Sequence, residues 1–197
     1  MMTAVLVFLS VLSIDPADAF TLRLGPFSRF LFPSIGDRPI VNDIQDLDNI
    51  FLPSEPEVMV GASVMLEFIP SFQLEISGSY VGYEFDPLFG DPFPDSTWII
   101  ERSVDLAVVS VGLRKCLGEV YVQAGSDILF YNGSWVRTDG TGWGGYHDEY
   151  KGTTWGPFLG IGKDLHTGIA EFDIALRLHL PDLSDRWISA GLSVFFH

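Results

Sequence analysis

The sequence has 197 residues, with 26 Asp and Glu against 11 Lys and Arg, which gives a formal net charge of −15. Hydrophobic residues make up 47% and aromatic residues 14%, a composition that excludes a disordered chain. The acidic balance argues against nucleic acid as a partner, because binding to nucleic acid requires cations that neutralise phosphates. No apolar run approaches the roughly 20 residues that a membrane-spanning helix requires.

The first nineteen residues predict a secretory signal peptide. Residues 1–12 are almost wholly apolar, Asp15 and Pro16 end the run, and Ala17-Asp18-Ala19 has the form of a cleavage site. We therefore divide the chain into a signal peptide, 1–19, and a single domain, 20–197. Cys116 is the only cysteine, so no disulfide framework forms within the chain.

Alternation of apolar and polar residues predicts eight β-strands in the remaining chain. They lie near residues 20–32, 57–69, 72–85, 97–114, 119–131, 152–162, 169–180 and 187–197. Two hairpins are clearest, because both of their strands agree about which face is apolar. The first sets Leu66 opposite Leu74 and Val64 opposite Ile76. The second sets Arg177 opposite Ser189 and Leu178 opposite Ile188.

The strand at 97–114 is assigned by the same alternation. Its even positions, including Val104, Leu106 and Val108, form the apolar face. Glu101, Ser103 and Asp105 then lie on the opposite, polar face.

The connections alternate in length along the chain. Short turns follow the second, fourth and sixth strands, whereas long loops, near 33–56, 86–96 and 132–151, follow the first, third and fifth. Short turns at one end and long loops at the other are typical of bacterial outer-membrane barrels with an even number of strands. The sequence thus predicts an all-β fold, an eight-stranded antiparallel up-and-down transmembrane β-barrel.

The final strand carries a family resemblance. Its residues run Asp185-Arg186-Trp187-Ile188-Ser189-Ala190-Gly191-Leu192-Ser193-Val194-Phe195-Phe196, with an early Trp, a Gly in the middle and aromatic residues at the end. This segment resembles the closing strand of OmpW-type proteins. The whole domain resembles, as architecture, the small eight-stranded outer-membrane proteins that include OmpW, OmpX and the OmpA barrel. The resemblance implies an outer-membrane location, contact with outer-membrane lipid, and folding by the barrel-assembly machinery.

Charged side chains on the polar face of the strands are expected to fill the lumen. An eight-stranded barrel is just wide enough for its own side chains to fill. These charges form either an ion-pair plug or a selectivity gate, and we favour the plug. The predicted lumen set is Arg23, Arg29, Glu67, Glu75, Glu101, Asp105, Asp127, Glu171, Asp173, Arg177 and His179.

The loop predicted at 132–151 is rich in Gly and aromatic residues, a composition that suits binding of sugars or proteins as well as simple capping of the barrel mouth. The candidate binding residues are Trp135, Trp143, Tyr146, His147 and Tyr150.

Catalysis and metal binding have weak support, and we predict no enzyme and no cofactor. The nearest catalytic trio, Ser189, His179 and Asp173, faces the lumen and not the lipid. The acidic cluster at 43–48 lacks the Gly and the late Glu of a calcium loop.

Two functions remain open. The first is passive passage or binding of small solutes, including hydrophobic ones as the OmpW resemblance implies. The alternative is a cell-surface interaction protein with a plugged lumen, which meets a host or surface ligand through its outer loops.

Overall fold

The computed structural model describes residues 21–32, 56–90, 98–139, 145–167, 170–180 and 186–196. The predicted signal peptide, most of the predicted loops 33–56 and 86–96, and Trp143 lie outside these residues.

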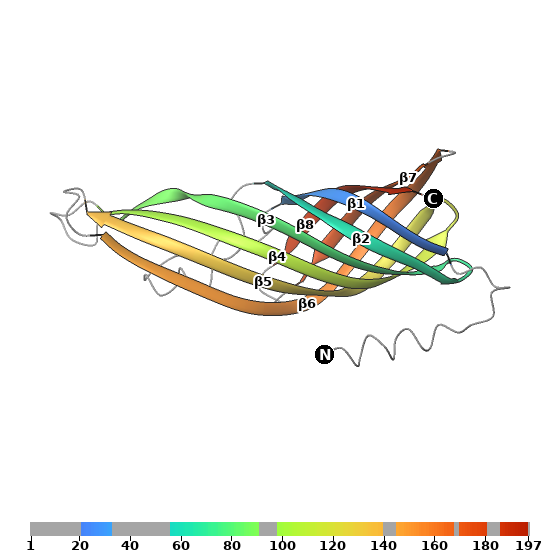
Figure 1. The fold of residues 1–197 in the computed structure, drawn as a ribbon, viewed down its shortest axis with the longest axis horizontal. Coiled ribbons are helices and arrows are strands. Elements are labelled where there is room, and N and C mark those ends of the chain that lie inside the picture. The colour runs from blue at the N-terminus through green and yellow to red at the C-terminus, as the bar shows by residue number, and fades with distance from the viewer. Residues whose placement is uncertain are drawn as a thin grey trace.

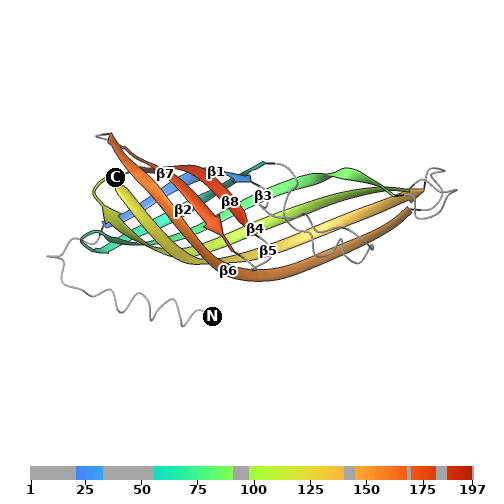
Figure 2. The same cartoon turned by 180° about the vertical axis from the view of Figure 1, so that it is seen from behind.

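Eight antiparallel strands form one closed barrel in chain order, and β8 pairs with β1 (Figure 1). Figure 2, which views the barrel from the opposite side, shows that β7 and β8 complete the wall there. The strands are β1 (Thr21–Phe32), β2 (Glu57–Ile69), β3 (Phe72–Gly90), β4 (Trp98–Leu117), β5 (Val120–Asp139), β6 (Gly145–Thr167), β7 (Ala170–His179) and β8 (Trp187–Phe196). The predicted fold, an eight-stranded antiparallel barrel, is confirmed.

Both predicted hairpin registers are also confirmed. Leu66 lies opposite Leu74 in the first hairpin, and Arg177 lies opposite Ser189 in the second. The turn after β4 contains Gly118, whose φ of 79° is in the left-handed region that Gly adopts without steric cost.

The barrel has the polarity of a membrane protein, with an apolar outer wall. On β4, for example, Val109, Val111, Leu113 and Leu117 point outward and are exposed, whereas Ser110 and Arg114 are buried inside. From Leu117 to Ala107 the wall rises roughly 33 Å along the strand, or about 25 Å after a tilt of about 40°. This matches the apolar band of about 25 Å that outer-membrane barrels present to lipid. No helix among the described residues is long and apolar enough to cross a membrane.

The four central strands are about twice as long as the others. β3 to β6 have 19, 20, 20 and 23 residues, whereas β1, β2, β7 and β8 have 12, 13, 10 and 10. In Figure 1 they continue past the rest of the wall. We call the continuation the projecting sheet, comprising 81–90, 98–106, 131–139 and 145–152.

The prediction of a loop at 132–151 is therefore wrong for most of that segment. β5 and β6 remain paired from Val120↔Lys163 to Thr138↔Gly145. Gly133, one of the glycines that suggested a loop, is a site of close packing inside this strand pair. A Cβ on Gly133 would lie 2.2 Å from the Tyr150 ring, so only Gly leaves space for that ring.

Candidate functional site in the barrel lumen

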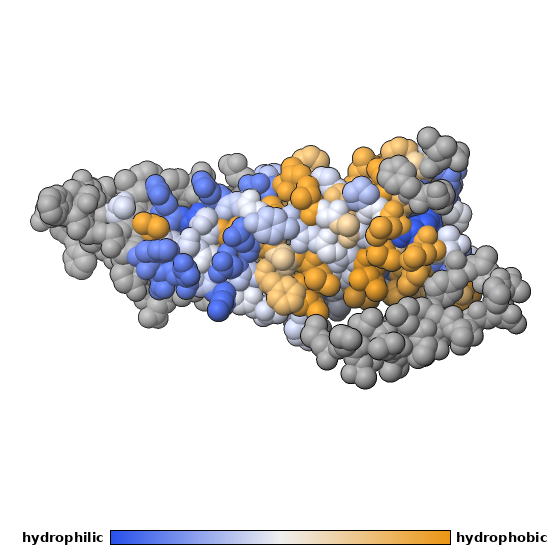
Figure 3. All heavy atoms as spheres, viewed as in Figure 1, coloured by the Kyte–Doolittle hydropathy of each residue, from blue (hydrophilic) through white to orange (hydrophobic). Residues whose placement is uncertain are grey.

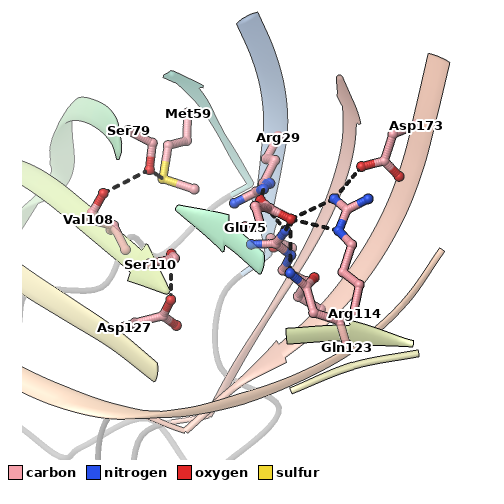
Figure 4. A network of polar contacts seen from close by, with 12 residues as sticks. Arg29, Met59, Glu75, Ser79, Val108, Ser110, Arg114, Gln123, Asp127 and Asp173 are labelled. Carbon is pink, nitrogen blue, oxygen red and sulfur yellow. Dashed lines mark hydrogen bonds and ion pairs between the residues drawn. The ribbon is translucent and has the colours of Figure 1, made fainter. Parts of the chain in front are cut away.

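The centre of the lumen is a carboxylate surrounded by arginines. Glu75 accepts hydrogen bonds from Arg114 Nε and Nη2, at 2.8 and 2.6 Å (Figure 4). It also accepts from Arg177 Nη2, at 2.6 and 2.7 Å. Gln123 Nε2 donates to the same carboxylate at 2.9 Å, and Arg29 Nη2 lies 3.2 Å away. These residues come from β1, β3, β4, β5 and β7, so the contacts join five strands across the lumen.

Further acids offset the excess positive charge around Glu75. Arg114 Nη2 donates to Asp173 at 2.5 Å, and the Tyr121 hydroxyl donates to the other oxygen of Asp173 at 2.5 Å. Arg23 pairs with Glu171 near the short-turn end of the barrel, with Glu67 3.7 Å from Arg23. We call this set the lower lumen network: Arg23, Arg29, Glu67, Glu75, Arg114, Tyr121, Gln123, Glu171, Asp173 and Arg177.

A second polar group lies farther toward the projecting sheet. His179 Nδ1 is 2.5 Å from Asp127 Oδ2, and His179 Nε2 is 2.8 Å from Ser189 Oγ. Ser110 donates to Asp127 at 2.6 Å, and the Trp187 ring stacks on His179 with centroids 3.6 Å apart. With Nδ1–H donating to Asp127, Nε2 accepts the proton of the Ser189 hydroxyl.

The order Ser–His–Asp is the order of a hydrolase triad. The acid is Asp127 and not the Asp173 of the predicted trio, because Asp173 pairs with Arg114 and Tyr121. Ser189, His179 and Asp127 are each only 1% exposed. In this buried position the hydrogen bonds fix the His179 ring and its contact with Trp187.

Apolar side chains fill the lumen above His179. This upper lumen cluster consists of Leu31, Met59, Val81, Tyr83, Val104, Leu106, Val108, Leu129, Trp135, Tyr150 and Trp187, all buried. Tyr131 packs against it. The described lumen is therefore occupied by buried ion pairs below and by buried apolar side chains above.

Nine of the eleven predicted lumen residues lie on the lumen side. Glu101 and Asp105 do not; they lie exposed on the outer face of β4, so their predicted orientation is wrong. The even positions of β4 face inward, because Val104, Leu106 and Val108 belong to the upper lumen cluster.

The same error hid Arg102 and Arg114, which are buried on the inward face of β4. Both share parity with Val104, Leu106 and Val108, and so the predicted orientation would have turned Arg114 out from the apolar belt toward lipid. That conflict was the available signal, because a cation on the lipid-facing side of a barrel is unfavourable.

The predicted loop-binding residues separate into different environments. Trp135 and Tyr150 are buried in the upper lumen cluster, so their prediction as surface loop residues is wrong. His147 is exposed on β6. Tyr146 belongs to β6 by its backbone, and Trp143 is outside the described residues. The described side chains contain no group of three or more His, Cys, Asp or Glu arranged to hold a metal ion.

The similarity of this chain to known proteins is found among solved structures. No protein-family model matches the chain, and no curated protein sequence matches it. Ail of Yersinia pestis, solved with the heparin analogue sucrose octasulfate, is 11% identical, with 90% of this chain and 96% of Ail covered and a TM-score of 0.49.

Two other solved structures are similarly distant. Neisserial surface protein A is 10% identical, with 92% of this chain and 99% of that chain covered and a TM-score of 0.39. The outer membrane protein OprG of Pseudomonas aeruginosa is 11% identical, with 90% and 95% covered and a TM-score of 0.42. The chain's own closed strand order, buried lumen charges and apolar outer wall define it as an eight-stranded transmembrane β-barrel. The OmpW-type resemblance of its last strand stays a prediction.

Proposed function

We propose that this chain is an outer-membrane protein that acts at the cell surface through its projecting sheet, with the closed barrel as its anchor. The observation that carries the proposal is the unequal strand length. The described ladder between β2 and β3 ends at Val60↔Tyr80, and the ladder between β6 and β7 begins at Phe158↔His179. Beyond these pairs, β3 and β6 are the edges of the projecting sheet.

An extended sheet edge supports binding, because its backbone N–H and C=O groups can pair with a strand from another protein. The outer face of the projecting sheet carries exposed acids, Glu84, Glu101, Asp105 and Glu149. Hydrophilic residues gather at this end in Figure 3, whereas hydrophobic residues gather nearer the other end. This acidic face favours a basic partner.

Adhesion of bacteria that display the protein tests the proposal. In the test variant, a two-residue Asn-Gly turn replaces residues 136–147 and joins the paired residues Trp135 and Asp148, which shortens β5 and β6 without reaching the barrel. We expect the shortened protein to keep its heat-modifiable gel mobility and to lose adhesion to epithelial monolayers and to immobilised basic peptides. Equal adhesion by the shortened and the full-length protein would contradict the proposal.

Passage or binding of small solutes is the second candidate. One observation favours it: the buried Nε and Nη1 atoms of Arg177 have no hydrogen-bond partner among the described residues. Unpaired guanidinium donors attract water or an anionic or polar solute. Planar-bilayer conductance of the native protein and of Arg177→Ala tests this candidate, and near-zero current in both would exclude a gate at Arg177.

The proposal includes three further expectations. Residues 1–19 direct export as a signal peptide, and the barrel-assembly machinery inserts the domain. We assign no catalytic activity, because Ser189 lies in a closed lumen. A fluorophosphonate probe should therefore leave Ser189 unlabelled in the folded protein.

A further inference from the structure

A groove lies on the outer wall where the apolar belt meets the projecting sheet. The strand registers place three successive rows of outward side chains across β3, β4, β5 and β6. The row deepest in the belt is Gly78, Val109, Ile128 and Trp155. The middle row is Tyr80, Ala107, Phe130 and Thr153. The third row, on the projecting sheet, is Gly82, Asp105, Asn132 and Lys151.

Small residues beside large ones make the hollow. The groove has a volume of about 530 Å³ and is lined chiefly by the middle and third rows. Ala107 lies between the exposed rings of Tyr80 and Phe130. One row deeper, Trp155 is 70% exposed, so the approach from the belt is aromatic.

Hydrogen bonding fixes one wall of the groove. The Tyr80 hydroxyl donates to Asp105 Oδ1, which holds the phenol ring against the sheet. Gly82 leaves room beside this contact, since a Cβ there would lie 3.0 Å from Asp105 Oδ1 and 3.2 Å from the Tyr80 hydroxyl and would displace them slightly. The wall is therefore a positioned aromatic ring with a carboxylate beside it.

The opposite wall carries a cation. Lys151 is exposed and pairs in register with Asn132, which pairs in turn with Asp105. One polar row thus offers an ammonium group, an amide and a carboxylate at neighbouring positions. Adjacent strands are about 4.8 Å apart, so the row spans roughly 10 Å from Lys151 to Asp105.

We propose that this groove binds the headgroup of a phosphorylated glycolipid in the outer leaflet. Lys151 pairs with a phosphate, because hydrogen bonds between ions of opposite charge are among the strongest in proteins. Asn132, Thr153 and Asp105 bind sugar hydroxyls, which both donate and accept hydrogen bonds. The acyl chains run down the apolar belt past Phe130 and Trp155.

The arrangement of charge favours this occupant over an ordinary phospholipid. The single phosphate and short glycerol of phosphatidylglycerol would reach Lys151 without extending along the row to Asp105, whereas a phosphorylated sugar headgroup is long enough to contact both ends of the row. Phosphatidylethanolamine matches the opposite charges of Lys151 and Asp105 but lacks the hydroxyls that Asn132 and Thr153 would bind. The aromatic rings lie at the level of the lipid headgroups, where Trp and Tyr are enriched in membrane proteins.

Native mass spectrometry of the full domain in detergent micelles tests the proposal. The protein is titrated with diphosphorylated lipid A, and separately with phosphatidylglycerol and phosphatidylethanolamine. We expect the native protein to retain lipid A best and Lys151→Gln to bind it about tenfold more weakly, as expected from losing one hydrogen bond to a charged group. Ala107→Trp, which fills the groove without changing its charge, should cause a similar loss.

Lys163→Gln is the matched control. Lys163 is a second lysine on β6, on the same outer side but near the short-turn end, where it pairs with Glu119 at 3.0 Å. This variant should bind lipid A as the native protein does. Heat-modifiable gel mobility checks that each variant is folded. Unchanged lipid A binding by folded Lys151→Gln, or an equal loss in Lys163→Gln, overturns the proposal. Equal or tighter binding of either phospholipid in a Lys151-dependent manner also overturns it.

Discussion

The lower lumen network and the upper lumen cluster fill the lumen of one barrel by different interactions, the first by ion pairs and the second by apolar packing. In the lower network, each buried charge has its partner on another strand, as Glu75 of β3 has in Arg177 of β7. Such contacts are directional and costly to leave unpaired. In the upper cluster, residues such as Leu106 and Leu129 pack without directional bonds.

The difference shows that, in a small barrel, one region can fix the arrangement of the strands while another excludes water from the lumen. Ion pairs between distant strands hold the strands in one arrangement and leave little tolerance for substitution. Apolar packing excludes water without directional bonds and tolerates changes that preserve side-chain volume. We therefore expect charge changes in the lower lumen network and volume changes in the upper lumen cluster to lower the free energy of unfolding more than changes at exposed positions do. The following variants compare the two regions.

Neutralising Glu75 should be the most damaging change. Glu75→Gln preserves shape but leaves Arg29, Arg114 and Arg177 around a neutral group. We expect a loss of about 3–5 kcal/mol in the free energy of unfolding, as for other buried ion pairs that lose one partner. Urea titration in micelles, followed by gel mobility, measures it.

Glu67→Gln is the control for Glu75→Gln. The Glu67 side chain is 34% exposed at the lower rim, 3.7 Å from Arg23. Its loss should shift the urea midpoint little. Equal midpoints for Glu75→Gln and the native protein would mean that the lower network does not depend on this carboxylate.

Truncating Leu106 should be the next largest change. Leu106→Ala leaves a cavity in the upper lumen cluster and should cost about 2–4 kcal/mol. Leu113→Ala, on the outer face of the same strand and 52% exposed, should cost clearly less in the same urea titration. If both variants lose the same stability, the upper cluster is not a sealed apolar core.

Asp127→Asn should have an intermediate effect at the boundary between the two regions. It removes the charge that His179 Nδ1 contacts, and a hydrogen bond to a charged group contributes about 1.5–3 kcal/mol. The stacked Trp187 ring should then change its near-ultraviolet circular dichroism. The spectral change should be absent when Asp127→Asn is made in a Trp187→Phe background; its persistence there would assign it to another tryptophan.

Removing an exposed ion pair should have the smallest effect. Lys163 and Glu119 are joined at 3.0 Å, with side chains 49% and 69% exposed. Exposed pairs are screened by water and salt and contribute little. Lys163→Gln should leave the urea midpoint unchanged, and a clear shift would show that this turn between β4 and β5 contributes to closure.

Sequence patterns predicted the fold and the two clearest hairpins because one face of each strand is uniformly apolar. Val64 and Ile76, for example, belong to unbroken apolar sets at every second position of their strands, which fixes their register. The rule failed on β4, where Val108 and Val109 face opposite sides and both sides are apolar. Where the lumen itself contains a hydrophobic cluster, the alternation of apolar and polar residues does not tell which face of a strand points inward.

The projecting sheet was missed for a different reason. Gly133 suggested a loop, but it leaves space for the ring of Tyr150 on the neighbouring strand, as Gly152 of the predicted strand 152–162 does for Tyr131. Composition alone does not distinguish a Gly that permits a turn from a Gly that receives an aromatic ring. The Asp127–His179 contact was also beyond sequence reasoning, since it joins residues of β5 and β7, which are not neighbours in the wall.

The two-sided apolar character of β4 has a consequence before the barrel forms. Residues 106–113 read Leu-Ala-Val-Val-Ser-Val-Gly-Leu, with no charge and several β-branched side chains. In the closed barrel one face of this segment meets lipid and the other meets the lumen. In an unfolded chain crossing the aqueous periplasm, both apolar faces of this segment would be exposed to water. Such a segment readily pairs with copies of itself. Expression of the protein should therefore depend more on periplasmic chaperones than its acidic net charge suggests, and Val109→Thr should reduce that dependence.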